Sequence, residues 1–318
     1  MTQTVAILLC TFQGERWLPE QLESLRAQTH DDWTLTVSDD GSTDATVRIV
    51  RDFAARVPQP VHITQGPQRG HAANFLTLSA SLAHAAPAPY YAWCDQDDVW
   101  YPEHLARALD ALRAQEAARP ALYCSRTRWV REDGQQALGL SSDWRRPAGF
   151  RHALAQCLAG GNTMVFNEAA RQLLVRAGVA EVPAHDWWLY LLLTGCGGQL
   201  VFDRVPSLDY RQHTGNLMGR NRGWRAQWAR ARKLLQGEYG RWVVDNLDAL
   251  HTRARDVLTP ENVRLLDAAR QLQSPSLRAR WQGWRQSGAY RQTALGQLGL
   301  LFAVLSGGFP QNTRGEDD

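Results

Sequence analysis

Three aspartates lie within four consecutive positions of the segment YYAWCDQDDVW, residues 90–100: Asp95, Asp97 and Asp98. Like charges this close repel one another, so the cluster needs a nearby source of positive charge. Two or more carboxylates in a short loop are how proteins hold Mg²⁺ or Mn²⁺, usually with substrate phosphates completing the coordination shell. The alternative without a functional role is a solvated acidic turn that includes a helix cap.

Two further polar clusters follow apolar runs. TFQGE, residues 11–15, follows the first run, and SDDGSTD, residues 38–44, follows the second and contains Asp39 and Asp40. In a parallel α/β sheet, ligands bind at the carboxyl ends of the strands. Three clusters at three such ends favour a ligand site over a solvated turn.

The elements that would position these clusters alternate up to residue 118. Apolar runs predict buried strands at residues 4–12, 33–39, 60–66 and 90–94. Helical spacing or a helix start predicts helices at residues 15–29, 45–57, 71–83 and 102–118, with Ser42 or Thr43 as a cap for the second. This β-α alternation predicts an α/β fold with a doubly wound, mostly parallel sheet.

The pattern becomes less regular after Pro120. Strands are expected within residues 121–130, 161–167 and 199–213, and a buried helix at residues 185–195. Beyond about Arg220 the sequence is helical and rich in Trp and Arg, and it ends in the apolar run at residues 294–309. The length of 318 residues suggests about two domains.

Charge is unevenly distributed along the chain. Residues 1–210 hold 18 basic and 23 acidic side chains, whereas residues 211–300 hold 16 basic and 6 acidic ones. The basic part suggests an anionic partner, such as phosphates or a peripheral contact with the inner membrane, and a solvated helical face is the equal alternative. We expect no nucleic acid partner.

The cysteines and the start of the sequence favour a cytoplasmic location. Five scattered cysteines without a CxxC pair read as buried thiols in a reducing compartment. The chain starts without a basic leader, so no signal peptide is expected. The longest apolar run is shorter than the roughly 20 residues that span a bilayer.

Other ligand motifs give weaker interpretations. No GxGxxG follows the first strand and no Walker A lysine is present, which disfavours dinucleotide and P-loop sites. DQDDV, residues 95–99, fits the DxDx(T/V) pattern of haloacid-dehalogenase-type phosphatases, with Asp95 as nucleophile. That family places the motif after its first strand and needs a downstream lysine, whereas here it follows the fourth and Lys233 lies in an Arg-rich segment.

Four segments in order resemble family 2 glycosyltransferases with the GT-A fold. Residues 5–44 resemble their opening, CDQDDVWYPEHL their DxD segment, and HDWWLYL with YRQHTGN the rhamnosyltransferase-like branch. The resemblance covers about residues 4–220. It implies a GT-A nucleotide-sugar-binding and catalytic domain at 1–220, followed by a basic helical C-terminal region with an apolar tail at 221–318.

The resemblance implies a role for each matching residue. Asp95 and Asp97 are the expected metal ligands for Mg²⁺ or Mn²⁺, and Asp98 extends their acidic patch. Asp40 would bind a pyrimidine base, and Arg69 and Asn74 would approach the ribose or diphosphate. The remaining expected donor-binding residues are Thr11, Phe12, Glu15, Gln96, Arg211 and His213. For His213, a hydrogen-bonded loop histidine is an equal alternative.

The catalytic residue implied by the resemblance is Asp186, as the general base that takes the proton of the acceptor hydroxyl. Many relatives carry Glu-Asp at this position, whereas this chain has His185-Asp186. A helix-capping role for Asp186 is the structural alternative. Trp187 and Trp188 are expected to stack on an acceptor sugar or, as an ordinary alternative, to pack in the helix.

The predicted function is therefore an inverting, metal-dependent glycosyltransferase of the cytoplasm. It would move a sugar, with L-rhamnose as a candidate, from a dTDP- or UDP-linked donor to a saccharide or lipid-linked saccharide. Such an enzyme would serve bacterial surface polysaccharide or O-antigen synthesis. The alternatives are a haloacid-dehalogenase-type phosphatase and a catalytically silent sugar-nucleotide-binding protein.

Overall fold

The computed structural model describes residues 3–81, 88–213 and 237–310. The chain divides into two compact units. The first consists of Met1–Asp143, Ala159–Val179 and Gly198–Arg220, and the second of Trp144–Leu158, Ala180–Gly197 and Asn221–Asp318. The second unit thus includes two short segments from within residues 1–220. The predicted division into domains at residue 220 stays a prediction.

The first unit contains a seven-stranded sheet. Its strands are β1 (Val5–Thr11), β2 (Trp33–Asp39), β3 (Val61–Gln65), β4 (Tyr90–Cys94), β6 (Ala121–Ser125), β9 (Val165–Asn167) and β10 (Gln199–Asp203). The order across the sheet is β10-β6-β9-β4-β1-β2-β3. All pairs are parallel except those of β9, which runs antiparallel to both β4 and β6. The predicted mostly parallel α/β sheet is confirmed.

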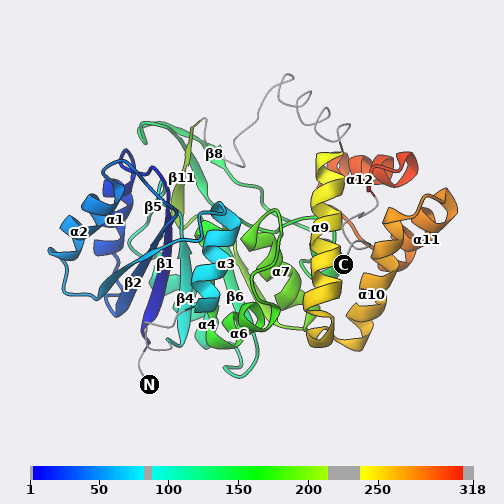
Figure 1. Cartoon of the computed structure of the whole chain (residues 1–318), viewed down its shortest axis with the longest axis horizontal. Helices are drawn as coiled ribbons and strands as arrows, with labels where there is room; N and C mark the ends of the chain where they lie inside the picture. Colours follow the sequence, from blue (N-terminus) through cyan, green and yellow to red (C-terminus); the bar gives the residue numbers. More distant parts are fainter. Residues whose placement is uncertain (1–2, 82–87, 214–236, 311–318) are drawn as a thin grey trace. The chain divides into compact units, whose positions relative to one another are not determined.

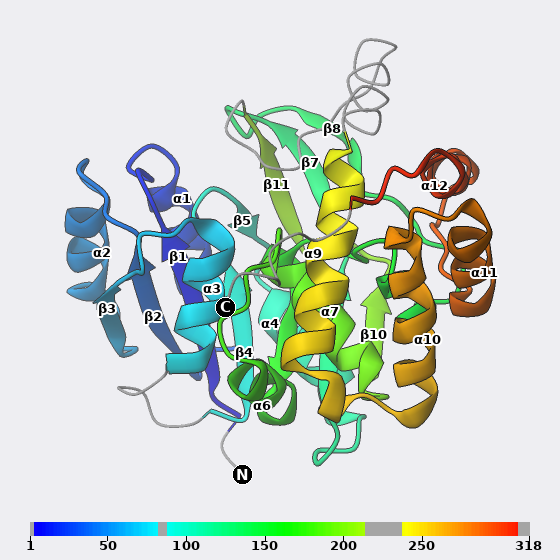
Figure 2. The same cartoon turned by 45° about the vertical axis from the view of Figure 1, so that its right-hand side comes forward.

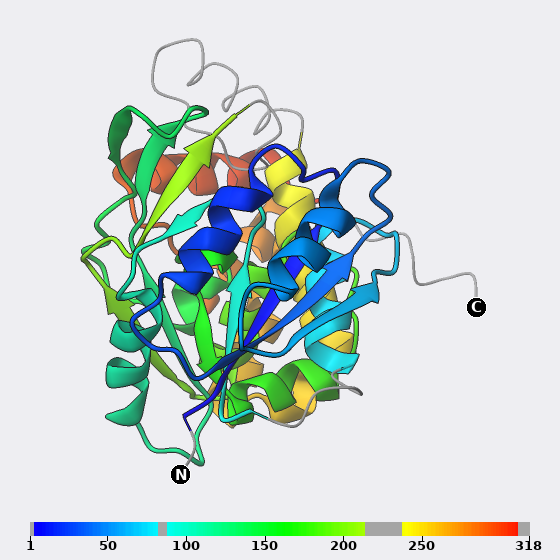
Figure 3. The same ribbon diagram turned by 90° about the vertical axis from the view of Figure 1, so that its left-hand side faces the viewer.

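Helices cover both faces of this sheet. They are α1 (Leu18–Arg26), α2 (Thr46–Ala54), α3 (His71–Ser81), α4 (His104–Arg113) and α6 (Glu168–Ala177). Every residue of β1 is buried. Val5, Ile7 and Leu9 of this strand share one core cluster with α1, α2 and α4, of which α1 and α2 are seen side by side in Figure 3. Helices α3 and α6 pack against each other and on strands of the sheet, as Figure 1 shows.

A second, smaller sheet has the order β5-β11-β7-β8. Its strands are β5 (Val99–Trp100), β7 (Arg128–Arg131), β8 (Ala137–Leu140) and β11 (Leu208–Gln212). The segments at 121–130 and 199–213, each predicted as one stretch of strand, therefore split between the two sheets. Because β5 begins at the acidic loop and pairs with β11, this sheet brings residues 97–98 beside residues 211–213.

The second unit is helical. Its helices are α5 (Phe150–Ala153), α7 (His185–Gly195), α9 (Glu238–Arg253), α10 (Pro260–Arg270), α11 (Leu277–Ser287) and α12 (Ala294–Ser306). Helices α9 to α12 pack in succession: α9 against α10, α10 against α11, and α11 against α12. Figure 2 shows the four helices together. None of the helices in the described ranges combines the length and apolar character that crossing a bilayer requires.

One local prediction is wrong. Neither Ser42 nor Thr43 caps α2, whose N-cap is Ala45 without a side-chain cap bond. Ser42 instead donates its hydroxyl to the buried carboxylate of Asp39 over 2.6 Å. The backbone N–H of Ala45 donates to Glu15 Oε2 at 2.9 Å, so a residue from the first loop stabilises the start of this helix.

Candidate active site

The three polar clusters meet at one edge of the large sheet. Strand β1 lies between β4 and β2, and all three run in the same direction. Thr11 pairs with Asp39, and Leu9 pairs with Cys94, so the loops that follow the three strands begin side by side. This is the edge at which parallel α/β sheets bind ligands.

The amide of Gln96 joins the first and third loops. Its Oε1 accepts the N–H of Phe12 and its Nε2 donates to the carbonyl of Phe12, each over 2.9 Å. A Cβ on Gly14 would lie 2.3 Å from Gln96 Oε1, so a glycine there permits this close approach. Gln96, predicted to bind the donor, therefore positions the loop that carries Asp95 and Asp97.

Each aspartate of the acidic loop has a different partner. Asp98 is fully buried and accepts hydrogen bonds from Asn162 Nδ2 at 2.5 Å and from the backbone N–H of Arg211 at 3.3 Å. Burial, together with repulsion from Asp97 and Asp95, raises the pKa of Asp98 well above its usual range. Asp95 Oδ1 lies 3.5 Å from His71 Nε2. The loop thus separates its three carboxyl groups, and Asp98 lies inside the fold rather than in an exposed patch.

Asp97 faces His213. The carboxylate Oδ2 lies 2.6 Å from His213 Nε2, and these side chains are 17% and 9% exposed. Trp17 stacks on the imidazole with ring centroids 4.2 Å apart and an interplanar angle of 18°. The ring nitrogen therefore points at Asp97. The sequence predicted both residues but gave no sign of Trp17, which lies almost 200 positions from His213.

This pair has the chemistry of a metal site. A carboxylate oxygen and an imidazole nitrogen are both ligands of Mn²⁺ and related ions. In the described part of the chain, no group of three or more His, Cys, Asp or Glu side chains is placed to hold a metal. The residues therefore fit an ion that takes few protein ligands and completes its shell with substrate oxygens and water, as Mg²⁺ and its substitutes commonly do.

Arg211 supports the acidic loop from inside the fold. Its side chain is 2% exposed and contacts Glu20 Oε2 at 2.5 Å. It also donates to the carbonyl of Asp97 at 3.0 Å and to that of Glu132 at 2.7 Å. These contacts hold the guanidinium inside the fold, so they favour a positioning role over the predicted contact with a diphosphate.

Arg211→Met should destabilise the protein strongly. It would leave the carbonyls of Asp97 and Glu132 without a buried donor, and we expect the free energy of unfolding to fall by about 2–4 kcal/mol. Urea denaturation measures it. Arg16→Met is the matched control, because Arg16 is 65% exposed and pairs with Glu132 at 2.5 Å. That change should cost less than about 1 kcal/mol; equal losses in the two variants would contradict the support role.

Several side chains expected to bind the donor nucleotide form a hydrogen-bond network that connects β1, β2, α3 and the loop before α3. Thr11 donates to Asp39 at 2.8 Å, and Asn74 exchanges two hydrogen bonds with Ser38 at 2.6 and 3.0 Å. Asp40 accepts the backbone N–H groups of Gln68 at 2.6 Å and Gly70 at 2.9 Å. Thr11 and Asn74 are buried, whereas Phe12 is 55% exposed and Arg69 is exposed.

Two loop residues that sequence reasoning missed have positive φ angles. Gln13 has φ +50° and Gln68 has φ +55°. The Gln13 side chain accepts the backbone N–H of Thr43 at 2.9 Å, and thereby connects the first loop to the second. Positive φ at residues other than glycine is costly and clusters at ligand sites. Its occurrence in the loops after β1 and β3 agrees with a ligand site at this edge. Single-sequence patterns carry no signal for such angles at glutamine.

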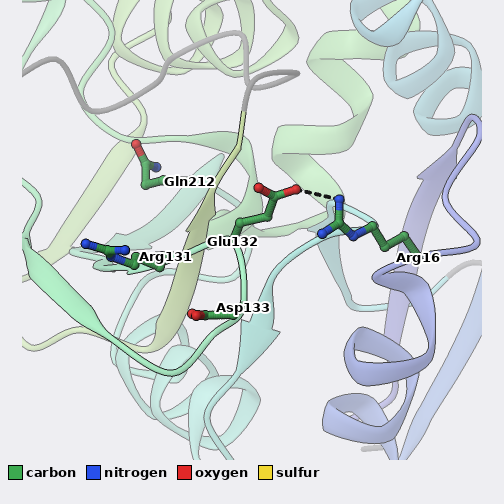
Figure 4. A pocket seen from close by; sticks show the side chains of 5 residues that line it. All are labelled: Arg16, Arg131, Glu132, Asp133 and Gln212. Atoms are coloured by element: carbon green, nitrogen blue, oxygen red, sulfur yellow. Dashed lines mark hydrogen bonds and ion pairs between the residues drawn. The ribbon is translucent and has the colours of Figure 1, made fainter.

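Two residues that directly precede Trp17 and His213 in the sequence help to line a surface cavity of about 410 Å³. Figure 4 shows its lining residues, Arg16, Arg131, Glu132, Asp133 and Gln212, with the ion pair between Arg16 and Glu132. Arg16 and Gln212 are the sequence neighbours of Trp17 and His213. Charged and amide groups of this kind suit a ligand rich in hydroxyl or phosphate oxygens.

Helix α7 of the second unit carries the predicted base. Asp186 is half-buried in the first turn, and its Oδ1 accepts the backbone N–H of Trp187 at 2.6 Å. The N-cap is Ala184, so Asp186 does not occupy the capping position. Trp188 is fully buried, and Trp187 is 5% exposed and donates its Nε1–H to the Ala153 carbonyl at 2.7 Å. Burial favours packing over acceptor stacking for both tryptophans.

Comparison with known proteins supports the assignment to a glycosyltransferase family. A dTDP-rhamnosyl transferase, RfbG of Shigella flexneri, is 28% identical over 227 residues, which are 70% of this chain and 77% of that protein. Residues 1–349 of S. aureus TarS, solved with UDP-GlcNAc, have a similar structure (TM-score 0.51, 12% identity, 90% of this chain and 93% of that one). So does the mannosyltransferase PcManGT of Pyrobaculum calidifontis, solved with GDP-Man and Mn²⁺ (TM-score 0.52, 18% identity, 94% and 74%).

These neighbours confirm the predicted GT-A fold. The family model for glycosyl transferase family 2 matches residues 6–174, more than half of the chain. This match includes the loops after β1, β2 and β4, and it decides against the phosphatase alternative, whose lysine at position 233 lies outside the described residues. The chain belongs to glycosyl transferase family 2.

Proposed function

We propose that this chain is a metal-dependent, inverting glycosyltransferase that moves L-rhamnose from a dTDP-linked donor to a saccharide acceptor. The observation that carries the proposal is the Asp97–His213 pair, placed where the loops after β1, β2 and β4 begin side by side. The similarity to a dTDP-rhamnosyl transferase supports the choice of donor. A UDP-linked donor is the alternative, since the relative is only 28% identical.

Asp97 and His213 are the proposed protein ligands of Mg²⁺ or Mn²⁺. The ion would offset the negative charge of the departing nucleoside diphosphate. Trp17 holds the imidazole in place, and the Arg211 guanidinium fixes the backbone of Asp97 through its carbonyl. Asp95, the other predicted ligand, has its Oδ1 3.5 Å from His71 Nε2 and stays a proposed ligand of the same ion.

Recognition of the base is assigned to Asp40. Each of its carboxylate oxygens accepts one backbone N–H from residues 68–70 and has a further lone pair. One of these oxygens would accept the N–H of a pyrimidine. Asp40 would thus bind the base and, at the same time, hold the loop that contains Arg69.

Asp186 is the proposed general base. It would take the proton of the acceptor hydroxyl as that oxygen attacks the anomeric carbon from the face opposite the diphosphate. The bond from the anomeric carbon to the diphosphate oxygen breaks as the new glycosidic bond forms, so the configuration inverts. His185 precedes it on α7 and is buried.

The proposed setting is the cytoplasmic side of a bacterial inner membrane, where the acceptor would be a saccharide or a lipid-linked saccharide for a surface polysaccharide or O-antigen. All five cysteines are free thiols, which suits a reducing compartment. Six of the basic residues on which the sequence-based membrane contact depended lie within residues 214–236, outside the described ranges.

Product analysis with a panel of nucleotide sugars tests the proposal. The full chain is incubated with dTDP-rhamnose, UDP-linked or GDP-linked sugars and an acceptor mixture. The products are identified by mass spectrometry, and the anomeric configuration of the new linkage is determined by NMR. We expect a deoxyhexose to be added only from dTDP-rhamnose, with the opposite anomeric configuration from the donor. Retained configuration would contradict inversion, and nucleotide binding without any product would indicate the catalytically silent alternative.

A further inference from the structure

Helix α12 is apolar on two opposite faces. Leu300, Ala303 and Val304 are buried within the second unit. The other face exposes four large side chains in the spacing three, four, three: Leu295 (71%), Leu298 (63%), Phe302 (53%) and Leu305 (48%). Residues at this spacing form one stripe along a helix. A contiguous exposed apolar stripe of this kind indicates a partner surface.

The surroundings of the stripe are positively charged. Residues 268–310 contain five arginines and neither aspartate nor glutamate, although Arg280 is buried and Arg270 pairs with Asp248. Arg278 and Arg285 lie exposed on α11, the helix on which α12 packs, and Leu277 (50%) and Trp281 (37%) are exposed on it as well. Exposed tryptophan and arginine beside a leucine-rich face are typical of helices that lie in the interface of a bilayer.

We propose that α12 docks on the anionic surface of a lipid bilayer, with Leu295, Leu298, Phe302 and Leu305 in the acyl boundary and Arg278 and Arg285 at the headgroups. The helix would lie in the membrane plane. It has 13 residues, which span about 20 Å against the roughly 30 Å of a bilayer core, so it cannot cross. Docking itself does not depend on the proposed function. Only its purpose, access to a lipid-linked acceptor, rests on that function.

Charge decides between a bilayer and a second copy of the chain. The three-four-three spacing would also suit a helix pair. However, two copies would bring together identical arginine-bearing, acid-free segments, whereas an anionic bilayer gains about 1 kcal/mol for each basic residue at its surface. The lipid surface is therefore the occupant that the charge favours.

Flotation with vesicles tests this inference without any sugar substrate. The full chain is mixed with vesicles of phosphatidylcholine alone or of equal parts phosphatidylcholine and phosphatidylglycerol. We expect binding to the anionic vesicles, weakened by salt. The double variant Leu298→Ser, Phe302→Ser should bind at least about tenfold more weakly. Arg278→Gln with Arg285→Gln should weaken it by about thirtyfold, roughly fivefold for each charge.

Matched variants separate the stripe from general effects. Val205→Ser changes an apolar side chain that is 59% exposed in the first unit, and Arg48→Gln changes an arginine that is 72% exposed on α2. Both should bind vesicles like the parent chain. The inference is wrong if the parent chain fails to bind anionic vesicles at low salt, or if the stripe variant binds normally.

Oligomeric state provides a second readout for the stripe. Loss of a dimer in the Leu298→Ser, Phe302→Ser variant, without a change in vesicle binding, would assign the stripe to a second copy and overturn the proposal. Transfer to a water-soluble acceptor should be unchanged in this variant. Failure of docking is thereby distinguished from failure of the proposed transferase activity, which the donor panel tests separately.

Discussion

Asp97→Asn should reduce sugar transfer by about a thousandfold or more, because loss of metal stabilisation of the departing diphosphate removes several kcal/mol from the transition state. Asn keeps the size and one neutral acceptor oxygen but loses the charge that attracts a divalent ion. The measurement is the initial rate with saturating donor. In addition, Mn²⁺ should increase nucleotide affinity for the parent chain and have little effect on this variant.

Controls for this variant come from the same fold. Asp110→Asn changes a carboxylate on α4 that is 76% exposed and pairs with Arg113 at 3.2 Å, and it should leave the rate unchanged. His213→Ala should reproduce the Asp97 defect, and the double variant should be little worse than either one, as expected of two ligands of one ion. Full activity after exhaustive chelation would show that the metal role is wrong.

The large sheet was predictable because most of its strands are short, apolar and followed by polar loops. Continuous burial of β1 agrees with its unbroken apolar run. The antiparallel strand β9 was not predictable in its place, since residues 165–167 insert between β4 and β6 through pairings with residues over 40 positions away. Patterns in one segment report its own periodicity and contain no information about such distant partners.

In the candidate site, too, the residue types were predictable from the sequence, whereas their partners were not. Residue types at the strand ends indicated Asp97 and, through the family resemblance, His213, which the structure brings to 2.6 Å from each other. Thr11 and Asn74, which were expected at the donor, have hydrogen bonds within the fold that the sequence did not indicate: Thr11 connects β1 to β2, and Asn74 connects α3 to β2. Sequence fixes the chemical type of a group, whereas its use depends on which polar atoms the fold places beside it.

Asp186→Asn should lower the turnover rate by about 10²- to 10⁴-fold while the affinity for the donor changes little. The base acts on the acceptor proton during attack and does not hold the nucleotide. Asn retains an oxygen that can accept the N–H of Trp187, as Asp186 does at 2.6 Å, so α7 should keep its first turn. Single-turnover rates and donor affinity, measured on the same sample, separate the two effects.

Asp40→Asn is the contrasting variant. Its side chain would offer one acceptor oxygen to the two N–H groups of Gln68 and Gly70, which Asp40 binds at 2.6 and 2.9 Å. Loss of one charge-assisted hydrogen bond should weaken donor binding by roughly tenfold or more. Turnover at saturating donor should then be much closer to that of the parent chain than for Asp186→Asn.

A purely structural role for Asp186 makes the opposite forecast for the same substitution. If the carboxylate only stabilises the start of α7, Asn should serve almost as well, because the favourable effect of a charge near a helix N-terminus is about 0.3–1 kcal/mol. The variant would then lose a little thermal stability and turn over normally. Near-normal turnover by folded Asp186→Asn therefore assigns proton transfer to another group. Glu181, which precedes this helix, and His185, its first residue, would be substituted next.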